Sequence, residues 1–201
     1  MDVYATASRR NRAVRWLSRR AGEARARRHA RFFPLTGVTA TSRVVDVGCG
    51  GVGLRALEPD LDITGVDVDP RPGYPGPFVQ ADAAAKLPFE DDAFDLAYSN
   101  SVVEHIDPGR RARFAAELRR VARGWYVQTP AIGFPLDPHS LLPFAHWLPV
   151  PLRRPYWRLG AGGEWEDIHL LRRSQMAGLF GDPRAERVGP LVKSWVSIRP
   201  I

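Results

Sequence analysis

The feature that most constrains the fold is a glycine-rich turn that directly follows a short β-branched segment. Residues 43–47 are Arg-Val-Val-Asp-Val, which is typical of a buried strand, and Gly48, Gly50 and Gly53 follow at once. Glycine permits a positive φ and lacks a Cβ, so the chain can leave the strand sharply and approach a ligand closely. A helix after the turn would present its free N-terminal amides there. The pattern predicts a strand, a tight turn and a helix around a small ligand.

Strand and helix patterns alternate along the rest of the chain. Pro108 and Gly109 begin a helical segment whose apolar stripe is Phe114, Leu118 and Val121. This alternation predicts an α/β fold in a single domain, with a Rossmann-like, doubly wound, mostly parallel sheet and a C-terminal antiparallel strand. The other expected elements are a helix over 174–180 with Ser174 as its N-cap, and strands over 63–68, 78–80, 94–99, 125–129, 184–188 and 194–199.

One connection is too short for a regular crossover. Asp67 and Phe78 are separated by a segment that includes Arg-Pro-Gly-Tyr-Pro-Gly-Pro at 71–77. A parallel crossover helix usually needs about a dozen residues or more, so we expect a loop here. One face of the sheet would then be thinly covered.

The chain divides by charge and composition. Ten arginines against Asp2 and Glu23 give residues 1–42 a charge of +8, which leaves −1 for the other residues of a chain with net charge +7. We predict a basic, helical N-terminal arm over 1–42, with its helix over 7–31 ended by Pro34 and Gly37. Residues 43–201 would form the main domain. Within it, the proline- and aromatic-rich segment 131–163 has no clean period, which is typical of a functional loop.

Composition limits the class of protein and its surroundings. A chain of 201 residues with 44% hydrophobic residues suits one globular domain. Its one cysteine excludes an internal disulfide, which suits a reducing compartment. No early apolar run resembles a signal peptide, and none is long enough to span a bilayer. We therefore expect a cytoplasmic location.

Carboxylates around the turn narrow the kind of ligand. Residues 48–53 match the dinucleotide fingerprint G-x-G-x-x-G, and Asp67 lies at a suitable distance to bind ribose hydroxyls. The fingerprint alone fits NAD and S-adenosylmethionine equally well. Asp46 disfavours a pyrophosphate at the turn and favours a cofactor with an ammonium and a sulfonium. Asp82 could accept the adenine amino group. Two plainer roles stay open, since Asp46 could only orient the turn and Asp82 could be a turn residue.

The sequence resembles the class I methyltransferase family, and its methyltransferase-11-like branch in particular. The resemblance covers roughly residues 43–130, with motifs in the family's order and spacing. Besides Val44–Gly53, the matching stretches are Gly-Val-Asp at 65–67, Gln-Ala-Asp-Ala at 80–83, Leu-Pro-Phe at 87–89 with Asp92, Phe94 and Asp95, Ser-Val-Val-Glu-His-Ile at 101–106, and Glu-Leu-Arg-Arg-Val at 117–121.

The resemblance implies S-adenosyl-L-methionine as the cofactor and a role for each matching residue. Gly48, Gly50 and Gly53 would shape the loop around the methionine part, and Asp67 would hold the ribose. The adenine would lie between Asp82 and Ala83 with Leu87 near its ring, and Ser99 and Asn100 would face the methyl group. Cys49 could instead be a small packing residue. The full implied set is Asp46, Gly48, Cys49, Gly50, Gly53, Asp67, Val68, Asp82, Ala83, Leu87, Ser99 and Asn100.

The methyl acceptor is expected to be small and hydrophobic, bound under the 131–163 segment. Catalytic candidates are His105, His139 and His146, although a histidine at the start of a helix or in an irregular loop is more often structural. The histidines lack metal-ligand spacing, so no metal is expected. O-methylation and C-methylation are not separated by these patterns.

Three hypotheses are open for what the arginine-rich arm contacts. It could cover the cofactor cleft as a surface helix, or lie on an anionic membrane together with Leu141, Leu142, Phe144 and Trp147. RNA is the weakest reading, because no aromatic stacking motif lies beside the arm. Two other classes of protein compete with a methyltransferase enzyme: a non-catalytic methyltransferase-like binding module and an NAD-dependent Rossmann enzyme.

Overall fold

The computed structural model describes residues 30–160 and 168–201, which belong to two compact units. The larger unit, Phe33–Phe134 with Asp167–Ile201, contains the sheet, and we call it the sheet unit. The main described part of the smaller unit is residues 135–160, which we call the insert. The helix predicted over 7–31 lies outside the described residues except for its end. Residues 30–36 are helical, so Pro34 does not end the helix; Gly37 does, with φ 75° and its N–H donated to Phe33 O.

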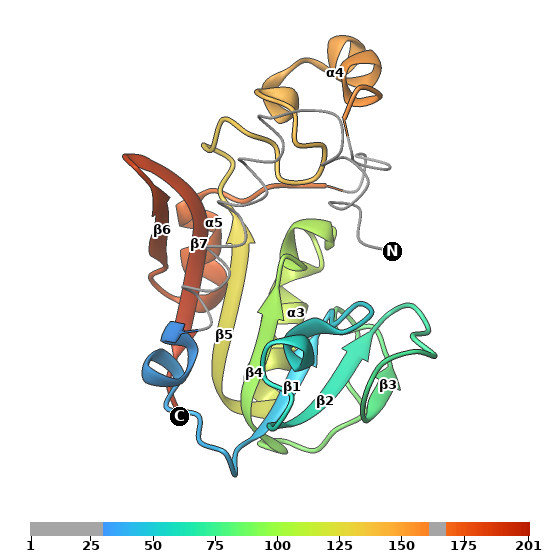
Figure 1. Cartoon of the computed structure of the whole chain (residues 1–201), viewed down its shortest axis with the longest axis vertical. Coiled ribbons are helices and arrows are strands. Elements are labelled where there is room, and N and C mark those ends of the chain that lie inside the picture. The colour runs from blue at the N-terminus through green and yellow to red at the C-terminus, as the bar shows by residue number, and fades with distance from the viewer. Residues whose placement is uncertain (1–29, 161–167) are drawn as a thin grey trace. The chain divides into compact units, whose positions relative to one another are not determined.

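The sheet unit is built on one sheet of seven strands in the order β3-β2-β1-β4-β5-β7-β6 (Figure 1). Strands β1 to β5 are parallel to their neighbours, whereas β7 pairs antiparallel with both β5 and β6. The predicted Rossmann-like fold class with a C-terminal antiparallel strand is therefore confirmed. The strands are β1 (Arg43–Val47), β2 (Asp62–Asp67), β3 (Phe78–Gln80), β4 (Phe94–Asn100), β5 (Ala122–Pro130), β6 (Arg184–Val188) and β7 (Leu191–Arg199).

The strand order reverses at β1, which is flanked by β2 on one side and β4 on the other. From β1 the chain proceeds outward to β2 and β3, and then returns to β4 and β5. In open parallel sheets, such a switch point leaves a crevice at the carboxyl ends of the strands. The residues that follow β1, β2 and β4 are therefore the ones that the fold brings to a common site.

The helix predicted directly after the glycine-rich turn is absent. Its place is taken by a single 3₁₀ turn, η1 (Gly53–Ala56). Pro59 and the start of β2 at Asp62 leave too little chain for a full α-helix after Gly53. The turn therefore lacks the row of helical N-terminal amides that the sequence pattern suggested.

The predicted loop between β2 and β3 is present, and β3 pairs with β2 in spite of it. Tyr74 from this loop packs on β2, where a Cβ on Gly65 would collide with the tyrosine ring and with Cys49 Sγ. Tyr74 and Cys49 are both buried. Two side chains thus cover the part of the sheet that a crossover helix would cover in a longer connection.

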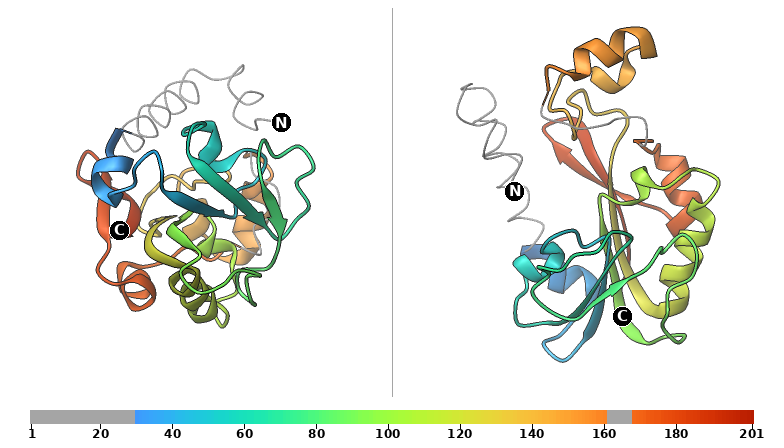
Figure 2. Two further views of the ribbon diagram at one scale, coloured as in Figure 1. Left: turned by 90° about the horizontal axis from the view of Figure 1, so that it is seen from below. Right: turned by 90° about the vertical axis from the view of Figure 1, so that its right-hand side faces the viewer.

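Helices α3 (Arg111–Val121) and α5 (Arg173–Phe180) pack on the opposite face from η1 and the 68–77 loop (Figure 2). The predicted stripe of Phe114, Leu118 and Val121 is fully buried in the core. Phe114 meets Phe180 of α5 edge to face, with ring centroids 6.2 Å apart. The N-cap of α5 is Arg172 rather than the predicted Ser174, and its N–H is donated to Gln175 Oε1 at 2.9 Å.

The insert contains a 3₁₀ turn, η3 (Ala145–Trp147), and a short helix, α4 (Val150–Trp157). The sequence shows no helical period here because Pro151 and Pro155 interrupt it. Pro151 lies in the first turn, where no intrahelical N–H bond is required, and Pro155 lies inside the helix. In the described parts of the chain, no helix combines the length and the apolar character needed to cross a membrane.

Candidate functional site

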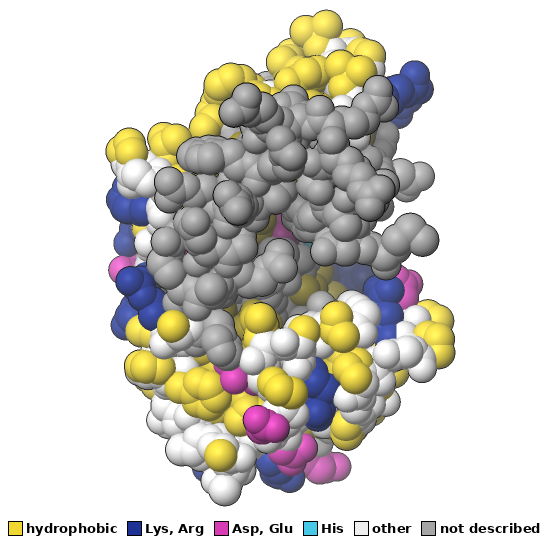
Figure 3. Space-filling model, viewed as in Figure 1, with side chains coloured by type: hydrophobic (Ala, Val, Ile, Leu, Met, Phe, Trp, Pro, Cys, Tyr) yellow, Lys and Arg dark blue, Asp and Glu magenta, His cyan; other side chains and the backbone are white. Residues whose placement is uncertain are grey.

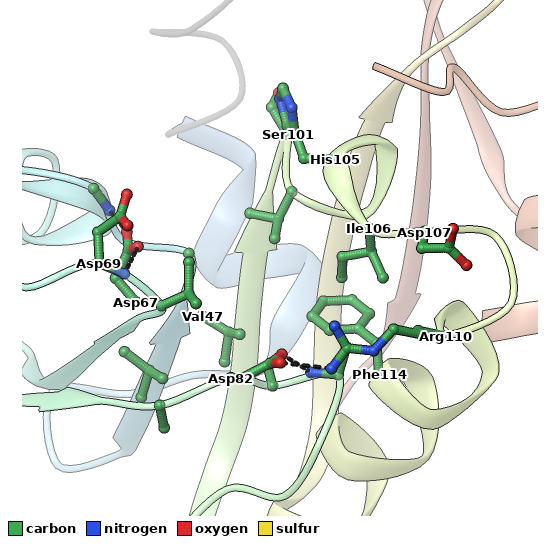
Figure 4. A pocket seen from close by; sticks show the side chains of 18 of the residues that line it. Val47, Asp67, Asp69, Asp82, Ser101, His105, Ile106, Asp107, Arg110 and Phe114 are labelled. Carbon is green, nitrogen blue, oxygen red and sulfur yellow. Dashed lines mark hydrogen bonds and ion pairs between the residues drawn. The ribbon is translucent and has the colours of Figure 1, made fainter. Parts of the chain in front are cut away.

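A cavity of about 540 Å³ lies at the carboxyl ends of β1, β2 and β4, where the strand order reverses (Figure 4). Its lining combines backbone from the glycine-rich turn, carboxylates from the ends of β2 and β3, and an apolar wall. The lining residues are Val47, Gly48, Gly50, Val66, Asp67, Val68, Asp69, Arg71, Ala81, Asp82, Ala83, Ala84, Ser101, Val102, His105, Ile106, Asp107, Arg110 and Phe114.

The glycine-rich turn is packed too closely for side chains at two of its positions. Gly48 has φ 77°, and a Cβ there would collide with Val102 across the cavity wall. Gly53 has φ 52°, and a Cβ there would collide with the carboxylate of Asp46. The amides of Gly48 and Cys49 are donated to Val66 O, at 2.8 and 3.1 Å, which holds the turn against β2. Gly48 and Gly53 are therefore required by packing as well as by backbone conformation.

Asp46 supports the turn from inside the protein. Its side chain is buried, and its Oδ2 accepts a hydrogen bond of 2.6 Å from Leu54 N–H in η1. Burial raises its pKa to about 7, and the neighbouring negative charge of Asp67 adds to the effect. Asp46 is not among the residues that line the cavity. Of its two predicted roles, orientation of the turn is the one that these contacts show.

Asp67 faces the cavity and is held ionised (Figure 4). Its Oδ2 accepts the Gly50 N–H at 2.9 Å, while its Oδ1 accepts the Asp69 N–H at 3.1 Å and Arg71 Nη2 at 3.2 Å. Burial alone would raise its pKa, but these hydrogen bonds, that of Arg71 first, outweigh burial and hold the pKa below its ordinary value. A carboxylate at the end of β2 is thus fixed in place beside the glycine-rich turn.

Asp82 forms a second charged point in the cavity lining. Its Oδ1 accepts the Ala84 N–H at 2.8 Å, and its Oδ2 accepts Arg110 Nη2 at 2.5 Å (Figure 4). The hydrogen bond from Arg110 lowers the pKa of Asp82. Arg110 precedes α3, so the ion pair joins two walls of the cavity. Both Asp67 and Asp82 were singled out in the sequence, whereas their arginine partners were not.

The predicted cofactor residues divide into two groups. Gly48, Gly50, Asp67, Val68, Asp82 and Ala83 line the cavity together with the catalytic candidate His105. The others lie outside this lining: Asp46, Cys49 and Gly53 support the turn, Leu87 and Ser99 are buried, and Asn100 ends β4. Ser101, with φ 59°, reaches the cavity in place of Ser99 and Asn100 because the chain turns sharply after β4.

A buried carboxyl lies behind the His105 wall. Glu104 is fully buried, and its Oε2 accepts a hydrogen bond of 2.9 Å from Thr129 Oγ1. Burial raises its pKa to about 7. Its backbone oxygen accepts the His169 N–H at 2.8 Å, and Arg111 Nη2 is donated to His169 O at 2.6 Å. This network holds the segment after β4 in place at the cavity wall.

The other two candidate histidines belong to the insert, where Asp137 organises them. Asp137 is fully buried, and its Oδ1 accepts the N–H groups of His139 and Ser140 at 2.9 and 2.8 Å. Its Oδ2 lies 3.1 Å from His146 Nδ1. Burial acts to raise the pKa of Asp137, but the hydrogen bonds, that with His146 first, lower it overall. Sequence patterns did not identify Asp137, because the contacts arise from an irregular loop.

Comparison with known proteins agrees with this geometry. Residues 45–124 match the family model of the methyltransferase domain. An uncharacterized methyltransferase of Mycobacterium marinum is 40% identical over 73 residues, which cover 36% of this chain and 28% of the relative. One of Mycobacterium avium is 35% identical over 98 residues, covering 43% and 38%. The matches therefore span well under half of the curated relatives.

Solved structures share the fold at low sequence identity. A SAM-dependent methyltransferase of Methanosarcina mazei has a TM-score of 0.52 at 18% identity, covering 80% of this chain and 92% of that one. A protein of Pyrococcus horikoshii has a TM-score of 0.55 at 18% identity, covering 88% and 90%. The 1,6-didemethyltoxoflavin-N1-methyltransferase of Burkholderia thailandensis, solved with S-adenosylhomocysteine, has a TM-score of 0.53 at 16% identity, covering 88% and 75%.

The cavity fits the cofactor of this family. Its wall at Gly48 and Gly50 lacks Cβ atoms, so a ligand can reach the backbone, and the ionised Asp67 offers a strong acceptor for hydroxyl groups. The apolar wall of Val102, Ile106 and Phe114 suits a flat ring. The sheet unit of this chain has the fold of S-adenosylmethionine-dependent methyltransferases, and its residues 45–124 match the methyltransferase domain.

Proposed function

We propose that this chain transfers a methyl group from S-adenosylmethionine to a small, hydrophobic acceptor. The observation that carries the proposal is the cavity at the strand switch point, where the Cβ-free turn at Gly48 and Gly50 faces the ionised carboxylate of Asp67. An ionised carboxylate held by three donors beside the turn is suited to accept the ribose hydroxyls of the cofactor.

The cofactor supplies a methyl group that its sulfonium already activates for displacement. The protein has to bind the cofactor and the acceptor, orient them for the transfer, and exclude water from the site. Asp67 would accept the ribose hydroxyls, and the turn at Gly48 and Gly50 would hold the amino-acid end. Asp82, fixed by Arg110, would lie at the adenine end.

The acceptor needs a base only if it must lose a proton before methylation. His105 is the candidate histidine that lines the cavity, so we assign it this role for an acidic acceptor, an oxygen or carbon nucleophile. The Burkholderia structure of similar fold was solved with 1,6-didemethyltoxoflavin bound, which supports a small-molecule acceptor here. A His105→Gln variant with unchanged turnover and an unchanged pH–rate profile would remove His105 from the reaction.

Calorimetry tests the cofactor half of the proposal. S-adenosylmethionine and S-adenosylhomocysteine should both bind, and NAD should not. Asp67→Ala should weaken S-adenosylhomocysteine binding at least tenfold, or about 1.4 kcal/mol, through the loss of hydrogen bonds to two hydroxyl groups. Asp69→Ala is the matched control, since Asp69 also lines the cavity but is an exposed carboxylate. Binding of NAD without S-adenosylhomocysteine would overturn the assignment.

Labelling tests the acceptor half. Incubation with a labelled methyl donor and fractionated cell extract should place the label in organic-soluble small molecules. Label in RNA or protein would contradict the proposed acceptor class. Cofactor binding without transfer to any fraction would favour a non-catalytic binding module.

A further inference from the structure

The insert exposes an unusual concentration of large apolar side chains. Of the exposed large hydrophobic residues in the described chain, five lie between positions 144 and 159. Their exposed fractions run from 49% for Trp147 to 76% for Leu159. Figure 3 shows hydrophobic side chains gathered over α4 at one end of the view. We call this set the apolar rim: Phe144, Trp147, Val150, Leu152 and Leu159.

The rim is held in place by the interior of the insert. The Asp137 carboxylate fixes the loop at His139, Ser140 and His146 through four hydrogen bonds. Arg153 Nη2 is donated to the backbone oxygens of His146 and Leu148, both at 2.9 Å. Buried polar contacts thus hold the loop from inside, while five large apolar side chains are left at its surface.

Phe144 shows that the outward arrangement is maintained against a backbone cost. It has φ 59°, in the left-handed region that non-glycine residues rarely adopt. Its N–H is nevertheless bonded to Pro135 O at 2.6 Å, and its ring lies 5.4 Å from that of Trp147. Two aromatic rings are therefore presented together at the surface, on a backbone that is already ordered.

The charge around the rim identifies the surface that it fits. From position 138 to 160 the chain has Arg153, Arg154 and Arg158 and no aspartate or glutamate. Arg154 and Arg158 are exposed beside the rim. Exposed tryptophan, leucine and phenylalanine next to arginine, without acidic residues, are typical of segments that lie in the interface of an anionic membrane.

We propose that the insert docks on an anionic lipid surface, with the apolar rim in the interface and Arg154 and Arg158 against the phosphate groups. The preformed loop lowers the ordering cost of this contact. The proposal places membrane contact in the insert instead of in the arginine-rich arm. It does not depend on methyl transfer, so it can fail or succeed separately from the proposed function.

Vesicle flotation of the full chain tests this directly. Binding to vesicles of phosphatidylcholine with one third phosphatidylglycerol should exceed binding to phosphatidylcholine alone, because each arginine near an anionic surface contributes about fivefold. The double variant Trp147→Ser/Leu152→Ser should lower binding at least tenfold. Its control is Val188→Ser/Leu191→Ser, which removes two exposed apolar side chains from the β6–β7 hairpin and should leave binding unchanged.

A second pair of variants tests the contribution of the two arginines to vesicle binding. Arg154→Glu/Arg158→Glu should remove the preference for anionic vesicles, whereas Arg113→Glu/Arg184→Glu, which alters two exposed arginines of the sheet unit, should retain it. All four positions are exposed, so circular dichroism should show folded protein in each case. Binding that persists in both insert variants but is lost when residues 1–29 are deleted would overturn the proposal. A dimer in lipid-free solution that the rim variants convert to monomer would assign the rim to a second copy of the chain and would also overturn it.

Discussion

The cavity of the sheet unit and the rim of the insert use the same kinds of residues in opposite ways. In the sheet unit, apolar side chains are buried and the carboxylates Asp67 and Asp82 face the cavity. In the insert, the carboxylate of Asp137 is buried and the aromatic side chains of Phe144 and Trp147 face outward. The difference follows from what each region has to support: a polar ligand at the ends of strands, or an apolar surface on a loop that lacks a sheet.

The two regions also depend on different supports. The glycine turn is held by a ladder of strands and by Asp46 beneath it. The insert belongs to the smaller compact unit, and its internal polar contacts converge on Asp137 and Arg153. Damage to one region should therefore leave the other intact, and the predictions below test that separation.

The largest effect is expected at Asp137. Asp137→Ala removes the acceptor of four hydrogen bonds inside the insert, so we expect a local loss of about 3–5 kcal/mol. Hydrogen exchange should show the amides of residues 139–146 losing protection, while β1 and β4 keep theirs. Asp182→Ala, at an exposed carboxylate, is the control. Simultaneous loss of protection in the sheet would show that the two units are not independent.

Substitutions at Gly48 and its neighbours perturb the glycine turn of the sheet unit instead of the insert. Gly48→Ala places a Cβ against Val102 in a left-handed backbone and should cost about 2–3 kcal/mol in urea unfolding. Gly50→Ala meets only the backbone penalty, because nothing lies within 4 Å of its Cβ position, and should cost about 1 kcal/mol. Gly51→Ala has neither problem and should be within about 0.5 kcal/mol of the wild type. Equal costs at all three positions would contradict the packing account of the turn.

The pH dependence of stability should reveal the two buried acids of the sheet unit. Burial raises the folded-state pKa of Asp46 and of Glu104 to about 7, above the unfolded values. Between pH 4.5 and 7 the folded state therefore binds more protons than the unfolded state, and stability should fall as pH rises, by about 1 kcal/mol per pH unit for each of the two acids.

Isosteric variants identify the source of this slope. Asp46→Asn keeps an acceptor for Leu54 N–H and abolishes the titration, so it should flatten the decline and raise stability at pH 7.5. Asp69→Asn, at an exposed carboxylate, is the matched control and should leave the slope unchanged. A wild-type curve that rises from pH 4.5 to 7 would contradict the burial assigned to these acids.

The smallest effect is expected at the Arg110–Asp82 ion pair. Both side chains of the pair are about half exposed, so solvent screens the attraction between their charges. Loss of the ion pair should therefore lower the free energy of unfolding by well under 1 kcal/mol. Arg110→Ala should weaken S-adenosylhomocysteine binding about two- to fivefold at low salt and less in 0.5 M salt, since Asp82 loses its positioning partner. Arg113→Ala, on the exposed face of α3, should have no effect. A salt-independent loss would point to direct contact between Arg110 and the cofactor.

Much of the fold was predictable because its signals are local. The β-branched segment before Gly48 specifies β1, and the stripe of Phe114, Leu118 and Val121 specifies α3. The loop from 68 to 77 was predicted from its short length and its prolines and glycines. The helix after Gly53 was wrongly predicted, because the pattern there describes the turn and not the chain length that Pro59 leaves available. The helix α4 was not predicted because its two prolines interrupt the helical sequence pattern.

The candidate site was partly predictable for a similar reason. A glycine or a carboxylate at the end of a strand can be read from its position, as Gly48 and Asp67 were. The partners Arg71 and Arg110 could not be identified, since a salt bridge across a cavity depends on which segments the sheet brings together. The same holds for the contact between Asp137 and His146.

The sequence by itself determined the strand and the glycine turn, because positive φ angles and strand ends are properties of short segments, and its resemblance to a known family indicated the class of cofactor. Both Asp46 and Asp67 are largely buried, and only the tertiary structure decided that Asp67 lines the cavity while Asp46 lies beneath the turn. Both are aspartates in neighbouring parallel strands, but Asp67 is the last residue of β2, and Asp46 precedes the end of β1, where η1 covers it. Access to the cavity depends on what packs against a residue, and no short segment of sequence contains that information.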